Sequence, residues 1–274
     1  TSSPETLIVT GDMDVTAEFT LLEYSLTTQV NGSGSGSVEV SPAGPYNYGD
    51  VVTLWANASA GSEFTGWFGD LSGTSSPETL IVTGDMDVTA EFMLFESIQL
   101  ISQWNLISTP FENSIDTDEI VVSYNGLNYS WSEAADNDII LSYVYGWNRS
   151  ENGYETGDIF NPGFGYWIYS YHDNVELNFI GEYSDDSTIT DVNVQWNIIG
   201  LPNNESVAKE DLIVQYDGQN YTWYEATTGN NAAGEPLILS YLYGWNSGYQ
   251  LADIVVPGKG YWLYAYYNCT ILLP

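Results

Sequence analysis

Hydrophobic and polar residues alternate along many short stretches of the chain. At residues 26–30, 52–56 and 88–92, aliphatic, β-branched or aromatic side chains occupy every second position. Pairs such as Asn-Gly, Gly-Asp and Pro-Gly separate these stretches. A period of two over short runs predicts the strands of a β-sandwich or barrel. We therefore predict an all-β chain in which only residues 132–136 and 224–228 form single helical turns.

Two segments are apolar on both faces, residues 166–171 (YWIYSY) and 261–266 (YWLYAY). A strand of this kind is usually central in a sheet or sandwiched between layers. Each segment follows a Pro-Gly pair, which predicts a tight turn before the strand. Both are predicted to lie in a core, with an exposed aromatic platform as the alternative.

A long identical repeat shows that part of the chain was duplicated. Residues 1–19, TSSPETLIVTGDMDVTAEF, recur unchanged at residues 74–92. Packing alone would not keep surface positions such as Thr1 and Ser2 identical, so the duplication is recent and implies an array. A complete unit runs from about residue 22 to residue 92. Residues 1–19 are then the tail of an earlier copy.

A second repeat fills the rest of the chain. QWNLISTP at 103–110 matches QWNIIGLP at 195–202, and PGFGYWIYSY at 162–171 matches PGKGYWLYAY at 257–266. The spacing between the copies changes only in polar, Gly- or Asn-containing stretches, as expected of loops. Two sister modules are predicted, joined by an acidic, Ser-rich segment at residues 182–187.

The repeats together predict tandem small β domains. They are a partial repeat hairpin at residues 1–20, a complete β repeat at 21–94, and two homologous, β-sandwich-like, tryptophan-rich modules at 95–186 and 187–274.

Charge excludes several classes of function. The 274 residues include 37 Asp and Glu against 3 Lys and Arg, a formal net charge of −34. The three cationic residues, Arg149, Lys209 and Lys259, are scattered singly and form no basic patch in the sequence. Binding to a nucleic acid or to an anionic membrane surface needs clustered cations and is therefore not expected. A hydrophobic content of 43% is too high for a disordered acidic tail. The chain is therefore predicted to fold and to bind no nucleic acid.

Targeting signals and the cysteine content say little about location or function. No stretch approaches the roughly 18 apolar residues of a membrane helix, so no membrane insertion is expected. The start is no signal peptide, which means that a leader was removed or that the chain is cut from a longer one. The single Cys269 permits no internal disulfide and is expected to be a small buried hydrophobe.

Residues 22–92 resemble the divergent internalin-type B repeats of bacterial and archaeal surface proteins. The matching elements are a Gly-rich hairpin at 24–42, a strand with FTGW within 48–73, and the ending GDMDVTAEF at 84–92. The resemblance implies a non-catalytic stalk or adhesion module at the cell surface. The sister modules are similar to tryptophan-rich modules of secreted prokaryotic proteins through YGWN and PGxGYW, a likeness that implies no established function.

Two kinds of modification or ion site are candidates. Asn-x-Ser/Thr triplets predict glycosylation if the chain is exported, although turn residues also account for them. They occur at Asn31, Asn57, Asn128, Asn148, Asn204, Asn220 and Asn268. Acidic clusters at 116–119, at 136–138 and at 185–186 near Asp191 leave a calcium site possible. None has the spacing of an EF-hand or of a nonapeptide repeat, so a solvated acidic surface is the preferred interpretation.

The chain is predicted not to be an enzyme. His172 is the only imidazole, and a tyrosine occupies its place in the sister module. Cys269 has no nearby cation in the sequence to lower its pKa. No nucleophile or cation is retained in both modules. With 37 Asp and Glu residues in the chain, composition does not identify a catalytic pair of carboxylates of the kind that glycosidases use. No cofactor is expected.

The residues that both modules retain are tryptophans and neighbouring glycines. The pairs are Trp104/Trp196, Trp131/Trp223, Trp147/Trp245 and Trp167/Trp262. Buried tryptophans dominate small β cores, and core packing is preferred because Trp131 and Trp223 are expected in short strands. The alternative is that these rings stack on sugars in a lectin-like module.

The N-terminal hairpin carries the assembly hypothesis. It is expected to turn at residues 11–14 and to place an apolar face on one side, formed by Leu7, Val9, Val15, Ala17 and Phe19. An isolated hairpin is marginal in water, so it needs a partner. One interpretation is that the sequence is truncated within an array, and the other is that the hairpin adds strands to an open edge of a neighbouring subunit. The predicted function is that of an acidic extracellular structural protein that self-associates into a surface filament, sheath or stalk. The alternative is an adhesin or carbohydrate-binding module with a glycan or cell-surface partner.

Overall fold

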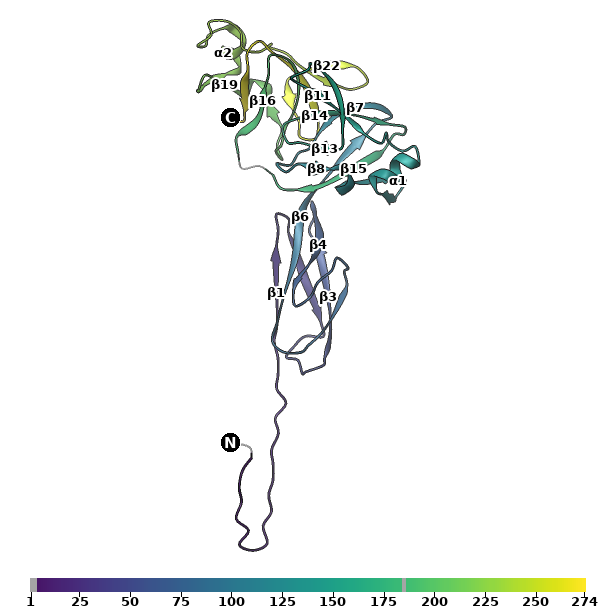
Figure 1. Cartoon of the computed structure of the whole chain (residues 1–274), viewed down its shortest axis with the longest axis vertical. Coiled ribbons are helices and arrows are strands. Elements are labelled where there is room, and N and C mark those ends of the chain that lie inside the picture. Colours follow the sequence, from purple (N-terminus) through teal and green to yellow (C-terminus); the bar gives the residue numbers. More distant parts are fainter. Residues whose placement is uncertain (1–3, 184–185) are drawn as a thin grey trace.

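The computed structural model describes residues 4–183 and 186–274. It has three parts along one long axis: an extended N-terminal segment, a slender β domain, and a broader head that holds the C-terminus (Figure 1). The architecture is almost entirely β, with several separate small sheets, which confirms the predicted fold class.

The slender domain contains the complete repeat and is a two-sheet sandwich. Its strands are β1 (Leu26–Asn31), β2 (Gly36–Ser41), β3 (Val51–Ala58), β4 (Ser62–Gly69), β5 (Glu78–Ile81) and β6 (Met86–Leu100). In one sheet β6 pairs with β1 in parallel and with β4 in antiparallel, and the other sheet has the order β2-β3-β5. Their inner faces enclose one core, in which Val52, Leu54 and Phe92 are fully buried.

The Gly-rich hairpin expected at residues 24–42 is wrong, because β1 and β2 lie in different sheets. The glycines between and within them let the chain cross Phe92 at very short range. A Cβ at Gly32 would lie 2.1 Å from the Phe92 carbonyl oxygen, and one at Gly36 would lie 2.4 Å from its ring. Gly32 also has φ of +98°, which a glycine adopts without strain. The glycines therefore allow a crossover between two sheets.

Strand β6 joins the repeat to the head without a loop. Its first half pairs with β1 and β4, and its second half pairs with β15 of the head, from Leu94 opposite Gly181 to Leu100 opposite Val175. The predicted boundary between residues 94 and 95 falls inside this strand. One continuous strand is shared by two hydrophobic cores, so the junction is a strand and not a linker (Figure 1).

The head contains two modules with the same order of elements. The first, after β6, has β7 (Gln103–Ser108), β8 (Ile115–Asp116), η1 (Thr117–Glu119), β9 (Val121–Tyr124), β10 (Leu127–Tyr129), α1 (Trp131–Asp136), β11 (Val144–Asn148), β12 (Gly153–Gly157), β13 (Ile159–Phe160), β14 (Gly165–Ser170) and β15 (Val175–Gly181). The second has β16 (Thr188–Val192), β17 (Gln195–Gly200), β18 (Val207–Ala208), η2 (Lys209–Asp211), β19 (Ile213–Tyr216), β20 (Gln219–Thr222), α2 (Trp223–Thr228), β21 (Leu242–Trp245), β22 (Tyr249–Ala252), β23 (Ile254–Val255), β24 (Gly260–Ala265) and β25 (Cys269–Leu272).

The sheets of the two modules correspond strand by strand. The order β12-β11-β14-β7 matches β22-β21-β24-β17, and β6-β15-β9-β10 matches β16-β25-β19-β20. The second half of β6 thus takes the place of β16. The strands β14 and β24 are each paired on both sides and buried on nearly every residue, which confirms their predicted position in a core.

Trp131 and Trp223 lie at the starts of helices, which corrects their predicted place in strands. Both helices have six residues, at the positions where single turns were expected. Ser130 caps the first through a capping box with Glu133, and Thr222 and Glu225 cap the second in the same way. The Ser/Thr-x-x-Glu spacing is a helix start signal that outweighs the alternating aromatic residues before it.

The predicted N-terminal hairpin has no paired strands. Among the described residues 4–23, none belongs to a strand, although the segment leaves the repeat, turns and runs back (Figure 1). The identical sequence at residues 77–92 contains β5 and the first half of β6. Those strands form because β3, β1 and β4 pair with them. Among the described residues, no strand pairs with the N-terminal copy.

Candidate functional site

The two modules of the head meet through a reciprocal pair of backbone contacts. The Ser108 amide donates to the Gly258 carbonyl at 3.2 Å, and the Gly200 amide donates to the Gly163 carbonyl at 3.1 Å. These hydrogen bonds join the end of β7 or β17 to the Pro-Gly turn of the sister module. The repeated PGxG motif is therefore part of an interface with approximate two-fold symmetry.

Glycines allow the close approach at this interface. A Cβ on Gly165 would lie 2.3 Å from Ile198 Cγ2, and one on Gly200 would lie 2.2 Å from the Ser108 Cβ. Real Cβ atoms do not approach this closely, so a side chain at either position would push the modules apart. Between the sheets, Leu106 and Ile198 are buried.

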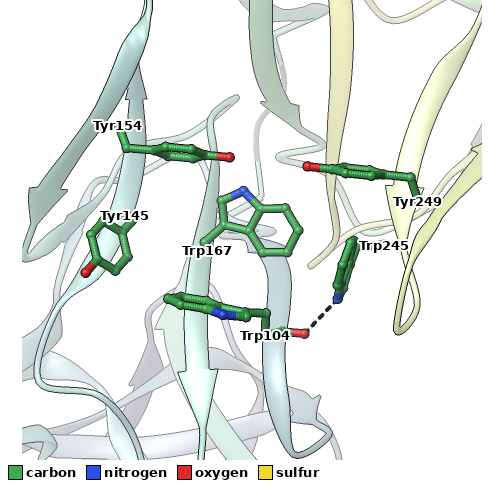
Figure 2. A pocket seen from close by; sticks show the side chains of 6 residues that line it. All are labelled: Trp104, Tyr145, Tyr154, Trp167, Trp245 and Tyr249. Atoms are coloured by element: carbon green, nitrogen blue, oxygen red, sulfur yellow. Dashed lines mark hydrogen bonds between the residues drawn. The ribbon is translucent and has the colours of Figure 1, made fainter.

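The aromatic residues of the interface form a cavity that we call box 1, with a volume of about 350 Å³. Its lining residues come from both modules and are Trp104, Tyr145, Tyr154, Trp167, Trp245 and Tyr249 (Figure 2). The plane of Trp167 makes angles of 89° with Trp104, 81° with Trp245 and 87° with Tyr249. In Figure 2 the Trp167 ring faces the viewer, and the rings of Trp104, Tyr154 and Tyr249 stand nearly edge-on around it. The rings thus form a floor with upright walls.

A second cavity, box 2, has a volume of about 470 Å³ and is the symmetry counterpart of box 1. Its lining residues are Trp147, Tyr154, Trp196, Tyr243, Tyr249 and Trp262. The centroids of Trp147 and Trp262 lie 4.9 Å apart, and those of the matching pair Trp245 and Trp167 lie 5.0 Å apart. Each box takes its floor from one module and a tryptophan wall from the other, so neither box is complete in a single module.

Polar groups are sparse in the boxes. Trp245 Nε1 donates to the Trp104 carbonyl at 2.8 Å, whereas the buried Nε1 atoms of its counterpart Trp147 and of Trp262 make no hydrogen bond. The hydroxyls of Tyr154 and Tyr249 point toward each other from the two modules (Figure 2). Burial raises the pKa of Tyr154, and the neighbouring Tyr249 raises it further. All residues that line the two boxes are tryptophan or tyrosine, so no Asp, Glu, Lys or Arg side chain lines either box.

The structure divides the retained tryptophans between core and cavity. Trp131 and Trp223 are buried in the cores of their own modules, as predicted. Trp104 and Trp196 are 37% and 36% exposed and form walls of the boxes, so the prediction that they lie in a core is wrong. The sequence did not reveal this division, because their neighbours across the cavity belong to the sister module.

Arg149 ties the first module to the second. Its guanidinium donates to Thr190 Oγ1 at 3.2 Å and to the Asp191 carbonyl oxygen, and it lies 3.9 Å from the centroid of the Phe164 ring. Burial lowers the pKa of Arg149 to about 10, although nearby Tyr166 and Asp191 oppose the shift. This arginine therefore has a structural role and is not a free cation.

The assembly candidates are all exposed. Exposure is 53% for Leu7, 74% for Val9, 76% for Val15 and 92% for Phe19, and Ala17 is exposed as well. The matching residues in the second copy are exposed by 6% or less, and they are Leu80, Val82, Val88, Ala90 and Phe92. The same sequence therefore presents to solvent the side chains that it elsewhere buries in a core.

The glycosylation candidates lie mostly on the surface. Six of the seven asparagines are exposed, and Asn148 is half-buried with its amide donating to Glu155. Asn128 and Asn220 occupy matching hairpins, where Asn128 accepts from Ser123 and Asn220 accepts from Gln215. Their modification stays a prediction.

Two carboxylates in or near the acidic clusters have structural partners. Asp116 Oδ1 accepts from the Asp118 amide and caps η1, and Asp191 Oδ1 accepts from Thr270 Oγ1 at 2.6 Å. Asp185 lies outside the described residues. Across residues 4–183 and 186–274, no three His, Cys, Asp or Glu side chains gather in a group that could hold a metal ion.

The side chains considered for catalysis, His172 and Cys269, belong to different modules. His172 stacks on Tyr124 with ring centroids 4.8 Å apart. Cys269 is buried, and burial raises the pKa of its thiol to about 12, with Asp191 adding to the shift. A thiol with this pKa is almost wholly protonated at neutral pH and is a poor nucleophile. No helix among the described residues has the length and hydropathy needed to cross a membrane.

Comparison with known proteins identifies one segment of the chain. No curated protein and no solved structure gives a significant match. The B-repeat is a non-catalytic surface domain, and its presence fits a non-enzymatic protein of the cell surface. Residues 26–95, from the start of β1 into β6, match the family model of the divergent InlB B-repeat domain, in agreement with the resemblance of residues 22–92.

Proposed function

We propose that the protein is an extracellular structural subunit that self-associates through its N-terminal segment into a surface filament, sheath or stalk. One observation carries this proposal. The sequence of residues 4–19 is exposed in the N-terminal copy and buried, with strands, in the copy at 77–92. Exposed apolar residues in a segment with strand-forming ability mark a surface that another chain can cover.

The proposed partner of the N-terminal segment is an exposed strand edge in a second copy of the chain. Strand β1 is an edge of its sheet, and β2 is an edge of the other sheet of the repeat. Such edges present unpaired amide and carbonyl groups that accept an added strand. Because donor and acceptor surfaces differ, the contact is head-to-tail and extends into a polymer.

The continuous β6 supports a load-transmitting role. A strand shared by the repeat and the head leaves no flexible linker between them. A pull on the repeat is therefore transmitted to the head through a β-ladder. This property suits a stalk or filament subunit.

Electrostatic repulsion sets the conditions for assembly. Subunits with a formal charge of −34 repel one another at low ionic strength. Salt shortens the Debye length to about 8 Å at physiological ionic strength and to less in more saline water. Assembly is therefore expected to strengthen as salt rises.

Sedimentation and negative-stain microscopy of the chain 1–274 test the proposal. The expected result is concentration- and salt-dependent polymers for the full chain, and folded monomers after deletion of residues 4–20. A Val15→Asp/Phe19→Asp variant should behave like the deletion. The matched control, Thr16→Asp/Thr20→Asp, adds two carboxylates to the same segment without replacing an apolar side chain, and it should still polymerise. Polymers of normal length from the deleted chain would refute the proposal.

The second candidate function is that of an adhesin or carbohydrate-binding module. The observation that favours a binding role is the pair of open, aromatic boxes in the head, at the far end of the molecule from the N-terminal segment (Figure 1). A glycan array probed with the full chain tests this candidate. Binding that is lost in a Trp104→Leu/Trp196→Leu variant would support it.

A further inference from the structure

The aromatic boxes have the geometry of a cage for a cation. Aromatic ring faces carry negative quadrupole potential, and a cation is attracted when it lies within about 6 Å of the ring centroids. In box 1 the centroid of Trp167 lies 5.0 Å from that of Trp245 and 6.4 Å from those of Trp104 and Tyr249. These rings pack edge to face around Trp167, and together with Tyr145 and Tyr154 they line one cavity into which a cation could enter.

The chemistry of the lining residues selects the kind of cation. Every lining side chain is a tryptophan or a tyrosine, so no carboxylate is available to pair with a primary ammonium and accept its hydrogen bonds. A methylated, quaternary ammonium has no N–H to satisfy, so its burial among rings costs less hydration than that of a primary ammonium. The volume of each box lies at the low end of the range of small-molecule pockets, roughly 300–1,000 Å³.

Charge complementarity favours a cation over a neutral ligand. The chain has a formal charge of −34, and this field raises the local concentration of cations at its surface. Of the three cationic residues, Arg149 is bound to the second module and Lys209 is paired with Asp253 at 2.6 Å. Lys259 is not among the residues that line the boxes.

A sugar fits the boxes less well than a quaternary ammonium. A sugar ring stacks on one flat aromatic face and needs donors and acceptors around its hydroxyls, and specific ligand sites place a few polar groups for this purpose. The boxes offer perpendicular walls, phenol hydroxyls and indole N–H groups, without amide or carboxylate side chains.

We propose that boxes 1 and 2 are twin binding sites for an organic cation with a trimethylammonium group, each built from both modules. The reciprocal interface explains why Trp104/Trp196, Trp147/Trp245 and Trp167/Trp262 persist as pairs in the two copies. The approximate two-fold symmetry makes the head bivalent.

Calorimetric titration of the full chain with choline tests the proposal, with tryptophan fluorescence as a second readout. The expected result is binding of two choline molecules per chain with a change in fluorescence. The control ligand is the uncharged isostere of choline, in which a tert-butyl group replaces the trimethylammonium group. It should bind about tenfold more weakly, because it lacks the charge that the ring faces attract. Added salt should weaken the binding of choline and leave that of the isostere unchanged.

Substitutions of one wall residue in each box show where choline binds. Trp104→Leu removes a wall of box 1 and Trp196→Leu the matching wall of box 2, so each should reduce the number of sites from two to one, and the double variant to none. Leucine keeps an apolar side chain, and the Trp104 carbonyl that accepts from Trp245 belongs to the backbone and remains. Tyr224→Leu is the matched control, because Tyr224 is 71% exposed and lies outside the boxes. This variant should still bind two choline molecules. Circular dichroism verifies that each variant is folded.

Three results would overturn the proposal: equal binding of choline and its isostere, no binding at tens of millimolar choline, or binding that persists in the folded double variant. Oligosaccharide binding that needs Trp104 and Trp196, without choline binding, would assign the boxes to sugars instead. Phosphocholine and a peptide with trimethyllysine, titrated in parallel, distinguish a lipid or polysaccharide headgroup from a modified protein as the source of the cation. None of these outcomes depends on whether residues 4–20 drive assembly.

Discussion

Phe92 and Phe19 occupy the same place in two identical sequences, so their replacement by alanine isolates the contribution of tertiary contacts. Phe92 is fully buried, with its ring centroid 5.7 Å from that of Phe64. Truncation of a buried phenylalanine costs about 3–5 kcal/mol, since it removes apolar contacts and leaves a cavity. Phe19 is 92% exposed, and its truncation should change the free energy of unfolding by less than about 0.5 kcal/mol.

The assay must read the repeat separately from the head. Hydrogen exchange with mass spectrometry does so, because peptides from β4 (Ser62–Gly69) report on the repeat alone. At low protein concentration and low salt, the β4 amides of Phe92→Ala should exchange much faster than those of the parent chain. Those of Phe19→Ala should be unchanged. Equal acceleration in the two variants, or none in Phe92→Ala, would refute the argument that burial in the sandwich distinguishes the copies.

Three further predictions concern the head. Gly200→Val should lower the free energy of unfolding by about 1–3 kcal/mol, because the added side chain overpacks the module interface. Gly248→Val is the control and should leave it unchanged, since a Cβ at Gly248 meets open space. Urea titration measures the free energy of unfolding of both variants. Hydrogen bonds from the cap residues Ser130 and Thr222 lower the pKa of Glu133 and Glu225. The ionised carboxylates therefore stabilise the fold at pH values above 4.5, the usual pKa of glutamate, and this stabilisation is lost as the pH falls through the lower pKa of the folded state. Replacing both with glutamine should flatten the pH dependence of thermal unfolding below about pH 4.5. Iodoacetamide at pH 8 should leave Cys269 unmodified until denaturant is added, as measured by intact mass, since burial raises its pKa to about 12.

Much of the fold could be predicted because local patterns and repeats carry it. The alternation at residues 26–30, 52–56 and 88–92 coincides with β1, β3 and β6. The two single helical turns appear where they were expected. Periodicity does not say which strand pairs with which, and for that reason the Gly-rich segment was predicted as a hairpin although β1 and β2 lie in separate sheets.

The candidate site was less predictable than the fold. The retained tryptophans are visible as pairs in the sequence, and stacking on sugars is one of the two interpretations that the sequence leaves open. Their division into core and boxes depends on residues far apart in the sequence, such as Trp167 beside Trp245 and Trp147 beside Trp262. The only signal in the sequence was that the same aromatic positions are retained in both modules.

The sequence by itself determined the repeat architecture, the β class, the excess of negative charge and the residues that the sister modules share. These properties follow from composition and from the spacing of residues along the chain. Tertiary structure alone decided that one copy of TLIVTGDMDVTAEF forms strands in a sandwich while the other is exposed, and that six rings from two modules line each box. The physical reason is that a strand needs a neighbour for its backbone hydrogen bonds and a cavity needs walls from several elements. Both are properties of contacts between distant segments and not of either segment alone.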